Sequence, residues 1–333
     1  QENTYVDLSV RLETPGWYWE KSYTVNAYSE ANALPTADWQ SGMVAYYGFN
    51  DDALADAFDS SRKASLLKKG TNKVPTLSDD DPLRTGNYVH LTFGANGNES
   101  YVAMPNPLLG QELANGATIS FWVKRADNNS WDALFGLTDG TARLYMTGNT
   151  YIGYNAGNAE NNNWIDINHP NDVASTNLGI GTWNLVTLVF TKSSVTMYVD
   201  SKKTNFSKWN GVMDGKTVTT ATGFDYSLLL DLLSSSAEIC LGKGSFWGSP
   251  DAMFDDFIVY NRALSISEVM ALGRMETRVF DFYGWATGID VVTTSQPHDP
   301  ASSVYYDLQG RRLSGRPTRG LYIKDHKIFK VDK

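Results

Sequence analysis

Short stretches in which apolar and polar residues alternate recur along this chain, and they constrain its fold more than any other feature. Residues 6–13 and residues 117–124 both alternate with a period of two, which is typical of a half-buried β-strand. The apolar stretches 183–191 and 195–199 are separated by only three residues, which predicts a β-hairpin. The first of that pair has almost no polar face, so we expect it in the middle of a sheet.

Only one stretch is typical of a helix. Ser265 and Glu268 have the spacing of a capping box, an apolar stripe follows them, and Gly273 is placed to end the helix. The sequence therefore predicts an all-β protein with one short helix.

Composition agrees with this fold class and excludes several functions. Aromatic residues make up 13% of the chain and there are 28 glycines, a mixture typical of short strands joined by turns. The formal net charge of −9 argues against a nucleic-acid partner, because phosphate binding needs clustered Lys and Arg. No apolar stretch reaches the roughly 18 residues of a membrane span. Cys240 is the only cysteine, which excludes an intrachain disulfide, and we expect it to be buried.

Changes of pattern along the 333 residues predict four parts. A β segment and linker are followed by a large β domain, a polar linker, and a C-terminal β-hairpin unit. Because the chain begins at Gln1 without a leader, we expect a mature exported form whose signal peptide is absent from this chain. The predicted boundaries are 1–42, 43–273, 274–300 and 301–333.

The chain carries five characteristic segments in order: Val44–Asp52, Tyr88–Phe93 with Tyr101–Pro105, Ala117–Lys124, Trp183–Asp200 and Phe254–Ser265. Together they resemble the laminin-G-like jelly-roll family of the concanavalin A-like lectin/glucanase superfamily. The resemblance implies an antiparallel two-sheet jelly-roll sandwich over residues 43–273. The C-terminal stretch 305–323 resembles β segments of exported bacterial proteins, including sorting domains, which implies a secreted or cell-surface bacterial protein.

The same resemblance implies a structural calcium ion that ties an early aspartate-rich loop to a late strand. Carried over residue by residue, the ligands are Asp52 and Asp255, with Asp59 as a third candidate. Carboxylate oxygens suit calcium. The alternative is that these aspartates cap turns through the local backbone. Asp255 and Asp256 are expected to point to opposite faces of a strand.

The sequence does not predict catalysis. The resemblance implies that glucanases of this fold carry an E-x-D-x-x-E strand, because hydrolysis needs two carboxylates roughly 5 to 10 Å apart. That string is absent, as are the G-x-S-x-G and H-E-x-x-H motifs. We therefore name no catalytic residue, and a divergent glycoside hydrolase stays an alternative.

Aromatic residues in polar segments point instead to glycan binding. Sugars stack their C–H faces on aromatic rings, while polar side chains bind the hydroxyl groups. The stretches 155–172 and 201–224 are predicted loops that carry several of these residues. Burial in the core is the alternative for each tryptophan, and a protein–protein adhesion module is the alternative to an oligo- or polysaccharide partner. The predicted ligand-binding residues are Trp131, Tyr154, Trp164, Asp166, Trp209 and Trp247.

Overall fold

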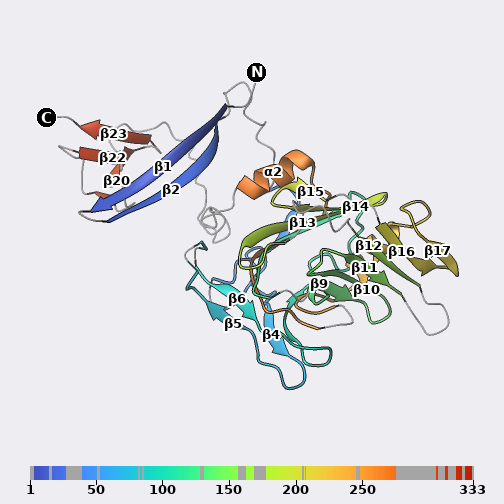
Figure 1. Cartoon of the computed structure of the whole chain (residues 1–333). Coiled ribbons are helices and arrows are strands. Elements are labelled where there is room, and N and C mark those ends of the chain that lie inside the picture. Colours follow the sequence, from blue (N-terminus) through green and yellow to red (C-terminus); the bar gives the residue numbers. More distant parts are fainter. Residues whose placement is uncertain are drawn as a thin grey trace. The chain divides into compact units, whose positions relative to one another are not determined.

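The computed structural model of the chain contains antiparallel β-sheets and, among the described residues, two short helices (Figure 1). The predicted all-β class is therefore confirmed. The chain divides into two compact units, Gln1–Thr287 and Gly288–Lys333. The structure describes residues 4–14, 17–27, 40–50, 53–81, 83–84, 86–127, 131–156, 163–168, 178–204, 206, 208–244, 248–274, 305–306, 312–313, 320–324 and 327–331.

Two antiparallel sheets form the body of the first unit. The first has nine strands in the order β17-β16-β12-β11-β10-β9-β18-β7-β4. Its strands are β4 (Ser65–Lys68), β7 (Ser100–Pro105), β9 (Ala133–Thr138), β10 (Arg143–Thr147), β11 (Ile152–Asn155), β12 (Trp164–Asn168), β16 (Lys208–Met213), β17 (Lys216–Val218) and β18 (Glu238–Leu241).

The second sheet has eight strands in the order β15-β14-β13-β8-β19-β6-β5, with β3 also paired to β19. The predicted hairpin is present as β13 and β14, and β13 lies inside the sheet as expected. The strands are β3 (Met43–Tyr47), β5 (Thr76–Ser78), β6 (Tyr88–Leu91), β8 (Ala117–Arg125), β13 (Trp183–Thr191), β14 (Ser194–Val199), β15 (Lys202–Lys203) and β19 (Ala252–Tyr260).

One hydrophobic core fills the space between the two sheets. Phe121 of β8 stacks on Phe135 of β9, with ring centroids 6.4 Å apart, so the two sheets meet at these rings. Both side chains are fully buried. Burying a side chain of this size stabilises the fold by about 1.5 to 3 kcal/mol. The apolar residues of β8 that alternate in the sequence all point into this core.

A smaller core lies on the other face of the eight-stranded sheet, beneath α2 (Ile266–Arg274). Val269 and Leu272 of α2 are buried there with Tyr46 and Trp122. The predicted capping box is present, because Ser265 Oγ accepts a hydrogen bond from the Glu268 backbone N–H at 3.3 Å.

A second helix, α1 (Ser227–Ser235), was not predicted. Its leucines at 229, 230, 232 and 233 are all buried. These four leucines fall within an arc of about 160° around the helix, with the exposed Asp231 and Ser235 opposite, so α1 is amphipathic.

The remaining strands form a two-stranded and a four-stranded sheet. β1 (Thr4–Thr14) and β2 (Trp17–Ala27) form an antiparallel hairpin, which includes the strand predicted from residues 6–13. The second unit is a four-stranded sheet in the order β21-β20-β22-β23, and the predicted terminal hairpin is β22 with β23. Within the described residues, no helix is long and apolar enough to cross a membrane. The last four strands are β20 (Tyr305–Tyr306), β21 (Arg312–Leu313), β22 (Gly320–Lys324) and β23 (Lys327–Val331).

Candidate functional site

Strand β12 carries two of the predicted ligand-binding residues on one face. Ile165 and Ile167 are buried in the core between the sheets. Because side chains alternate along a strand, Trp164 and Asp166 lie on the opposite, outer face of the nine-stranded sheet. Both are half-buried. The structure thus brings the Trp164 ring and the Asp166 carboxylate to the same surface.

Tyr145 lies beside Asp166 on this outer face. In the register of β10, β11 and β12, Gly153 separates them, opposite Tyr145 on one side and Asp166 on the other. The Tyr145 ring occupies the space over Gly153, where an added Cβ would be 2.1 Å from Cζ of the ring. Its hydroxyl donates a hydrogen bond to Asp166 Oδ1 at 3.4 Å. Burial raises the pKa of Asp166, and this hydrogen bond lowers it in part.

A second row of side chains lies next to the first. Asn155 pairs with Trp164 on one side and with Arg143 on the other. Asn155 and Arg143 are both half-buried. Figure 1 shows β10, β11 and β12 side by side, so the two rows form one continuous patch. We call this patch, made of Arg143, Tyr145, Asn155, Trp164 and Asp166, the outer-face site.

A cavity of about 200 Å³ is lined by residues of β9 and β18, the strands that follow β10 in the sheet. It lies over Gly136, which pairs with Tyr145, and over Cys240 of the next strand. Burial raises the pKa of the Cys240 thiol to about 12, so this thiol is unreactive. Cys240 contributes only to the lining of the cavity. Lys243 lines the cavity, and its ammonium nitrogen lies 4.2 Å from the centroid of the Tyr101 ring.

The structure places Tyr154 and Trp209 in strands, although both were predicted to lie in or beside loops. Tyr154 is in β11 and is only 5% exposed, with its ring against Phe224. Trp209 is in β16, opposite Ile167, and its ring packs against Phe224 and Tyr226. Both side chains face the core rather than the outer-face site. The stretches predicted as loops therefore contain strands β12, β15, β16 and β17.

The other predicted ligand-binding residues lie elsewhere. Trp131 precedes β9 and is 39% exposed, with its ring against Tyr151 at a centroid distance of 5.0 Å. Trp247 and the predicted calcium ligand Asp52 lie outside the described residues.

Asp255 binds an arginine. Arg84 Nε donates to Asp255 Oδ2 at 2.7 Å, and Arg84 Nη2 pairs with Asp256. The Arg84 guanidinium lies between two rings, 4.9 Å from the Trp122 centroid and 5.2 Å from that of Trp183. The side chains of Arg84 and Asp255 are almost completely buried. Burial, and then the charge of Asp256, raise the pKa of Asp255 despite the guanidinium.

The expectation that Asp255 and Asp256 point to opposite faces is wrong. The pairing of β19 with β8 is irregular between Asp255 and Ile258, and Asp256 has a φ of 48°. This bulge turns the Asp256 side chain, so both carboxylates reach Arg84.

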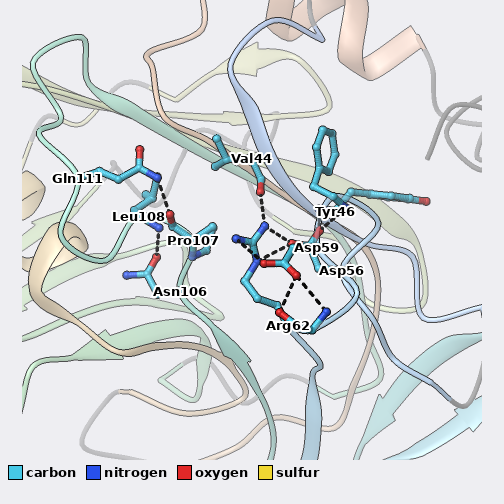
Figure 2. Close-up of polar contacts among 11 residues, drawn as sticks. Val44, Tyr46, Asp56, Asp59, Arg62, Asn106, Pro107, Leu108 and Gln111 are labelled. Carbon is cyan, nitrogen blue, oxygen red and sulfur yellow. Dashed lines mark hydrogen bonds and ion pairs between the residues drawn. The ribbon is translucent and has the colours of Figure 1, made fainter. Parts of the chain in front are cut away.

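Asp59 caps a turn and faces Arg62. Its Oδ1 accepts a hydrogen bond from the Ser61 backbone N–H at 3.0 Å, and hydrogen bonds from Ser61 lower the pKa of Asp59. Figure 2 shows Arg62 between Asp59, Asp56 and the Val44 carbonyl, with Nε 2.7 Å from Asp56 Oδ2.

The described carboxylates do not fit a calcium site. Within the described residues, no group of three or more His, Cys, Asp and Glu could hold a metal ion. Asp59 and Asp255 each have an arginine where a calcium site needs further oxygen ligands. Because Asp52 lies outside the described residues, a bound calcium ion stays a prediction.

The family of the chain follows from its sequence as well as its two-sheet body. A family model described as the concanavalin A-like lectin/glucanases superfamily, of the laminin G type, matches residues 96–270, which is more than half of the chain. The chain belongs to this superfamily. The matched span includes the whole outer-face site of this concanavalin A-like domain, and the predicted jelly-roll sandwich is confirmed. The resemblance of the C-terminal stretch to sorting domains stays a prediction.

Solved structures resemble this chain at low identity. Domain 4 of an extracellular arabinanase from Geobacillus stearothermophilus, solved with arabinotriose, is 16% identical, with a TM-score of 0.48 over 69% of this chain and 98% of that one. The binding domain of Paraclostridial Mosquitocidal Protein 1 is 16% identical, with a TM-score of 0.45 over 71% of this chain and 52% of that one. The binding domain of a botulinum neurotoxin of serotype D/C is 14% identical, with a TM-score of 0.42 over 72% and 53%.

This chain spans about half the length of those two toxin domains. A search of curated proteins finds no sequence match. These likenesses are too remote to indicate what this concanavalin A-like domain binds.

Sequence reasoning missed three members of the outer-face site: Arg143, Tyr145 and Asn155. The stretches 143–147 and 152–155 do alternate, which could have placed these side chains opposite the core. Their position beside Trp164 and Asp166 depends on the register between strands, which the alternation alone does not give.

Proposed function

We propose that this concanavalin A-like domain is a carbohydrate-binding module whose ligand lies along the outer-face site. The observation that carries the proposal is the placement of Trp164 and Asp166 of β12 and Tyr145 of β10 on one outer face, with a cavity of about 200 Å³ at the neighbouring strands β9 and β18. Membership in a superfamily of lectins and glucanases supports the same ligand class.

The chemistry of the site suits a neutral polyhydroxyl ligand. The Trp164 ring offers an apolar surface for the C–H face of a sugar. Among the described residues Asp166 accepts one hydrogen bond, from Tyr145, so its carboxylate retains acceptor capacity for sugar hydroxyl groups. Arg143 and Asn155 add polar groups along the neighbouring row. An aromatic surface with a few well-placed polar groups is the usual composition of a ligand site.

The described strands of this sheet favour binding over hydrolysis. They carry two carboxylates, Asp166 on β12 and Glu238 on β18, which are four strand positions apart. At a spacing of about 4.8 Å between strands, the separation is roughly 19 Å. Glycoside hydrolases place their two carboxylates about 5 to 9.5 Å apart. This pair is therefore too far apart to act as acid and base on one glycosidic bond.

Isothermal titration calorimetry of the full chain with neutral arabino-, xylo-, manno-, galacto- and gluco-oligosaccharides tests the proposal. We expect saturable binding of at least one sugar without release of reducing ends. Trp164→Ala and Asp166→Asn should each weaken it at least about tenfold, the effect of losing about 1.4 kcal/mol.

Trp209→Phe is the matched control, because Trp209 lies on the opposite face of the same sheet. It should lower stability and leave the affinity unchanged. Binding that survives Trp164→Ala and Asp166→Asn together would contradict the outer-face site, and a protein partner retained by that double variant would favour the adhesion alternative.

The proposal includes a secreted or cell-surface location in a bacterium. It is supported by the resemblance of residues 305–323 to segments of exported proteins. Fractionation of cells that make the natural protein, followed by immunoblotting, tests it.

A further inference from the structure

A second group of unusual residues lies around the end of β10, beyond the outer-face site. It includes the end of β8, the residues just before β9, and the turn between β10 and β11. We call Arg125, Trp131, Asp132, Thr147 and Tyr151 the rim cluster.

An exposed aromatic pair forms the surface of the rim cluster. The Trp131 and Tyr151 rings meet edge to face at 77°, with centroids 5.0 Å apart. Trp131 is 39% exposed, although tryptophan is among the residues that are usually largely buried. The contact with Tyr151 holds the indole in place, so the surface is fixed before any ligand arrives.

One carboxylate oxygen of the acid next to this pair has no hydrogen bond among the described residues. Asp132 is only 6% exposed, and its Oδ2 has no hydrogen bond within the described residues. The Thr147 hydroxyl is also buried without a partner among those residues. Burial first, and then the nearby Asp127 carboxylate, raise the pKa of Asp132 to about 6. Buried polar atoms nearly always have partners, so these two groups require an explanation.

The backbone around Gly148 joins the parts of the rim cluster. The Gly148 N–H donates to the Asp132 carbonyl at 3.0 Å, and the Gly148 carbonyl accepts from Arg125 Nη1 at 3.0 Å. In the same turn, the Thr147 N–H donates to the Tyr151 carbonyl at 3.0 Å. The aromatic pair and the buried acid are therefore connected through one short turn.

The charges of the cluster select the class of ligand. Asp127 and Asp132 disfavour an anion, while the Arg125 guanidinium disfavours a cation. The described residues contain no group of three or more His, Cys, Asp and Glu able to hold a metal. The ligand class that remains is a neutral molecule that donates hydrogen bonds to a carboxylate and offers an apolar face to an indole. Sugars have both properties.

We propose that the rim cluster is a second carbohydrate subsite, in which the sugar stacks on Trp131 and Asp132 accepts its hydroxyl hydrogen bonds directly or through one water. This inference does not depend on the outer-face site. A chain with two subsites would bind a polysaccharide more tightly than a short oligosaccharide, because the second contact becomes intramolecular.

Affinity electrophoresis of the full chain in gels containing arabinan, xylan, mannan, galactan or β-glucan tests the proposal. In the polysaccharide that retards the wild type, Trp131→Ala and Asp132→Asn should each lower the apparent affinity at least about tenfold. The double variant Trp131→Ala/Trp164→Ala should lose retardation. Phe58→Ala is the matched control, because Phe58 is 37% exposed and lies in another loop.

The variants separate the two proposals. Retardation that Trp164→Ala abolishes and the rim variants leave unchanged would overturn the rim subsite while supporting the outer-face site. The opposite pattern would support the rim subsite alone. Absence of retardation of the wild type in all five gels would overturn the rim subsite, as would equal losses for Phe58→Ala and Trp131→Ala.

Discussion

Replacing Asp132 with asparagine should make the protein more stable at neutral pH. The pKa of Asp132 is about 6 in the folded chain, against 3.8 for an ordinary aspartate. The folded state therefore binds a proton more readily than the unfolded state, and stability falls as the pH rises from about 4 to 6. At 1.36 kcal/mol for each pKa unit, ionised Asp132 costs about 3 kcal/mol above pH 6. Asparagine keeps the shape of the side chain and removes this cost.

Urea unfolding followed by intrinsic fluorescence measures the effect. At pH 7.5, Asp132→Asn should raise the free energy of unfolding by about 3 kcal/mol, and at pH 4 the gain should fall to about 0.5 kcal/mol. Asp139→Asn is the control with the opposite sign. Although burial raises the pKa of Asp139, hydrogen bonds from the Ala142 and Thr141 N–H groups lower it overall, so this variant should lose stability at neutral pH. An Asp132→Asn gain that is the same at both pH values would refute the reasoning.

Three further substitutions test the scaffold. Arg84→Met leaves Asp255 and Asp256 buried without their partner, so it should cost about 3 to 5 kcal/mol in urea unfolding at pH 7; a loss under about 1 kcal/mol would contradict the pairing. Gly153→Ala should displace the Tyr145 ring, 2.1 Å from the new Cβ, and cost about 1 to 3 kcal/mol, whereas an unchanged melting curve would contradict that contact. Ser265→Ala removes the cap of α2 and should cost about 1 kcal/mol in the same assay, with an intact stability arguing against the capping box.

Local patterns in the sequence were enough to predict the main elements of the fold. The alternation in residues 117–124 predicts β8 because every second side chain enters the core. The capping box at Ser265 predicts the start of α2 because its two hydrogen bonds are local. Helix α1 was missed although its leucines form an apolar stripe opposite Asp231, because it is only nine residues long and no side-chain cap marks its start. Each success thus depends on neighbours in sequence, and α1 lacks the capping signal that marks α2.

The candidate site was harder to predict than the fold. Trp164 and Asp166 are two residues apart, so a strand necessarily puts them on one face. Trp209 also lies among polar residues in the sequence, but the pairing of β16 with β12 places its side chain in the core. The positive φ of Asp256 brings both adjacent aspartates to Arg84, which lies more than 170 residues earlier in the chain. Pairing register and a single bulge decide these contacts, and neither leaves a local signal.

The central claim is that a sugar binds to the outer face of the nine-stranded sheet. Fluorine NMR of the chain labelled with 5-fluorotryptophan tests it most directly, with the Trp164 and Trp122 signals assigned by single replacement with phenylalanine. Titration with the oligosaccharide that binds most tightly should shift the Trp164 signal. The Trp122 signal should not change, because Trp122 is buried in the smaller core beneath α2. A bound sugar that leaves the Trp164 signal unmoved would contradict the account.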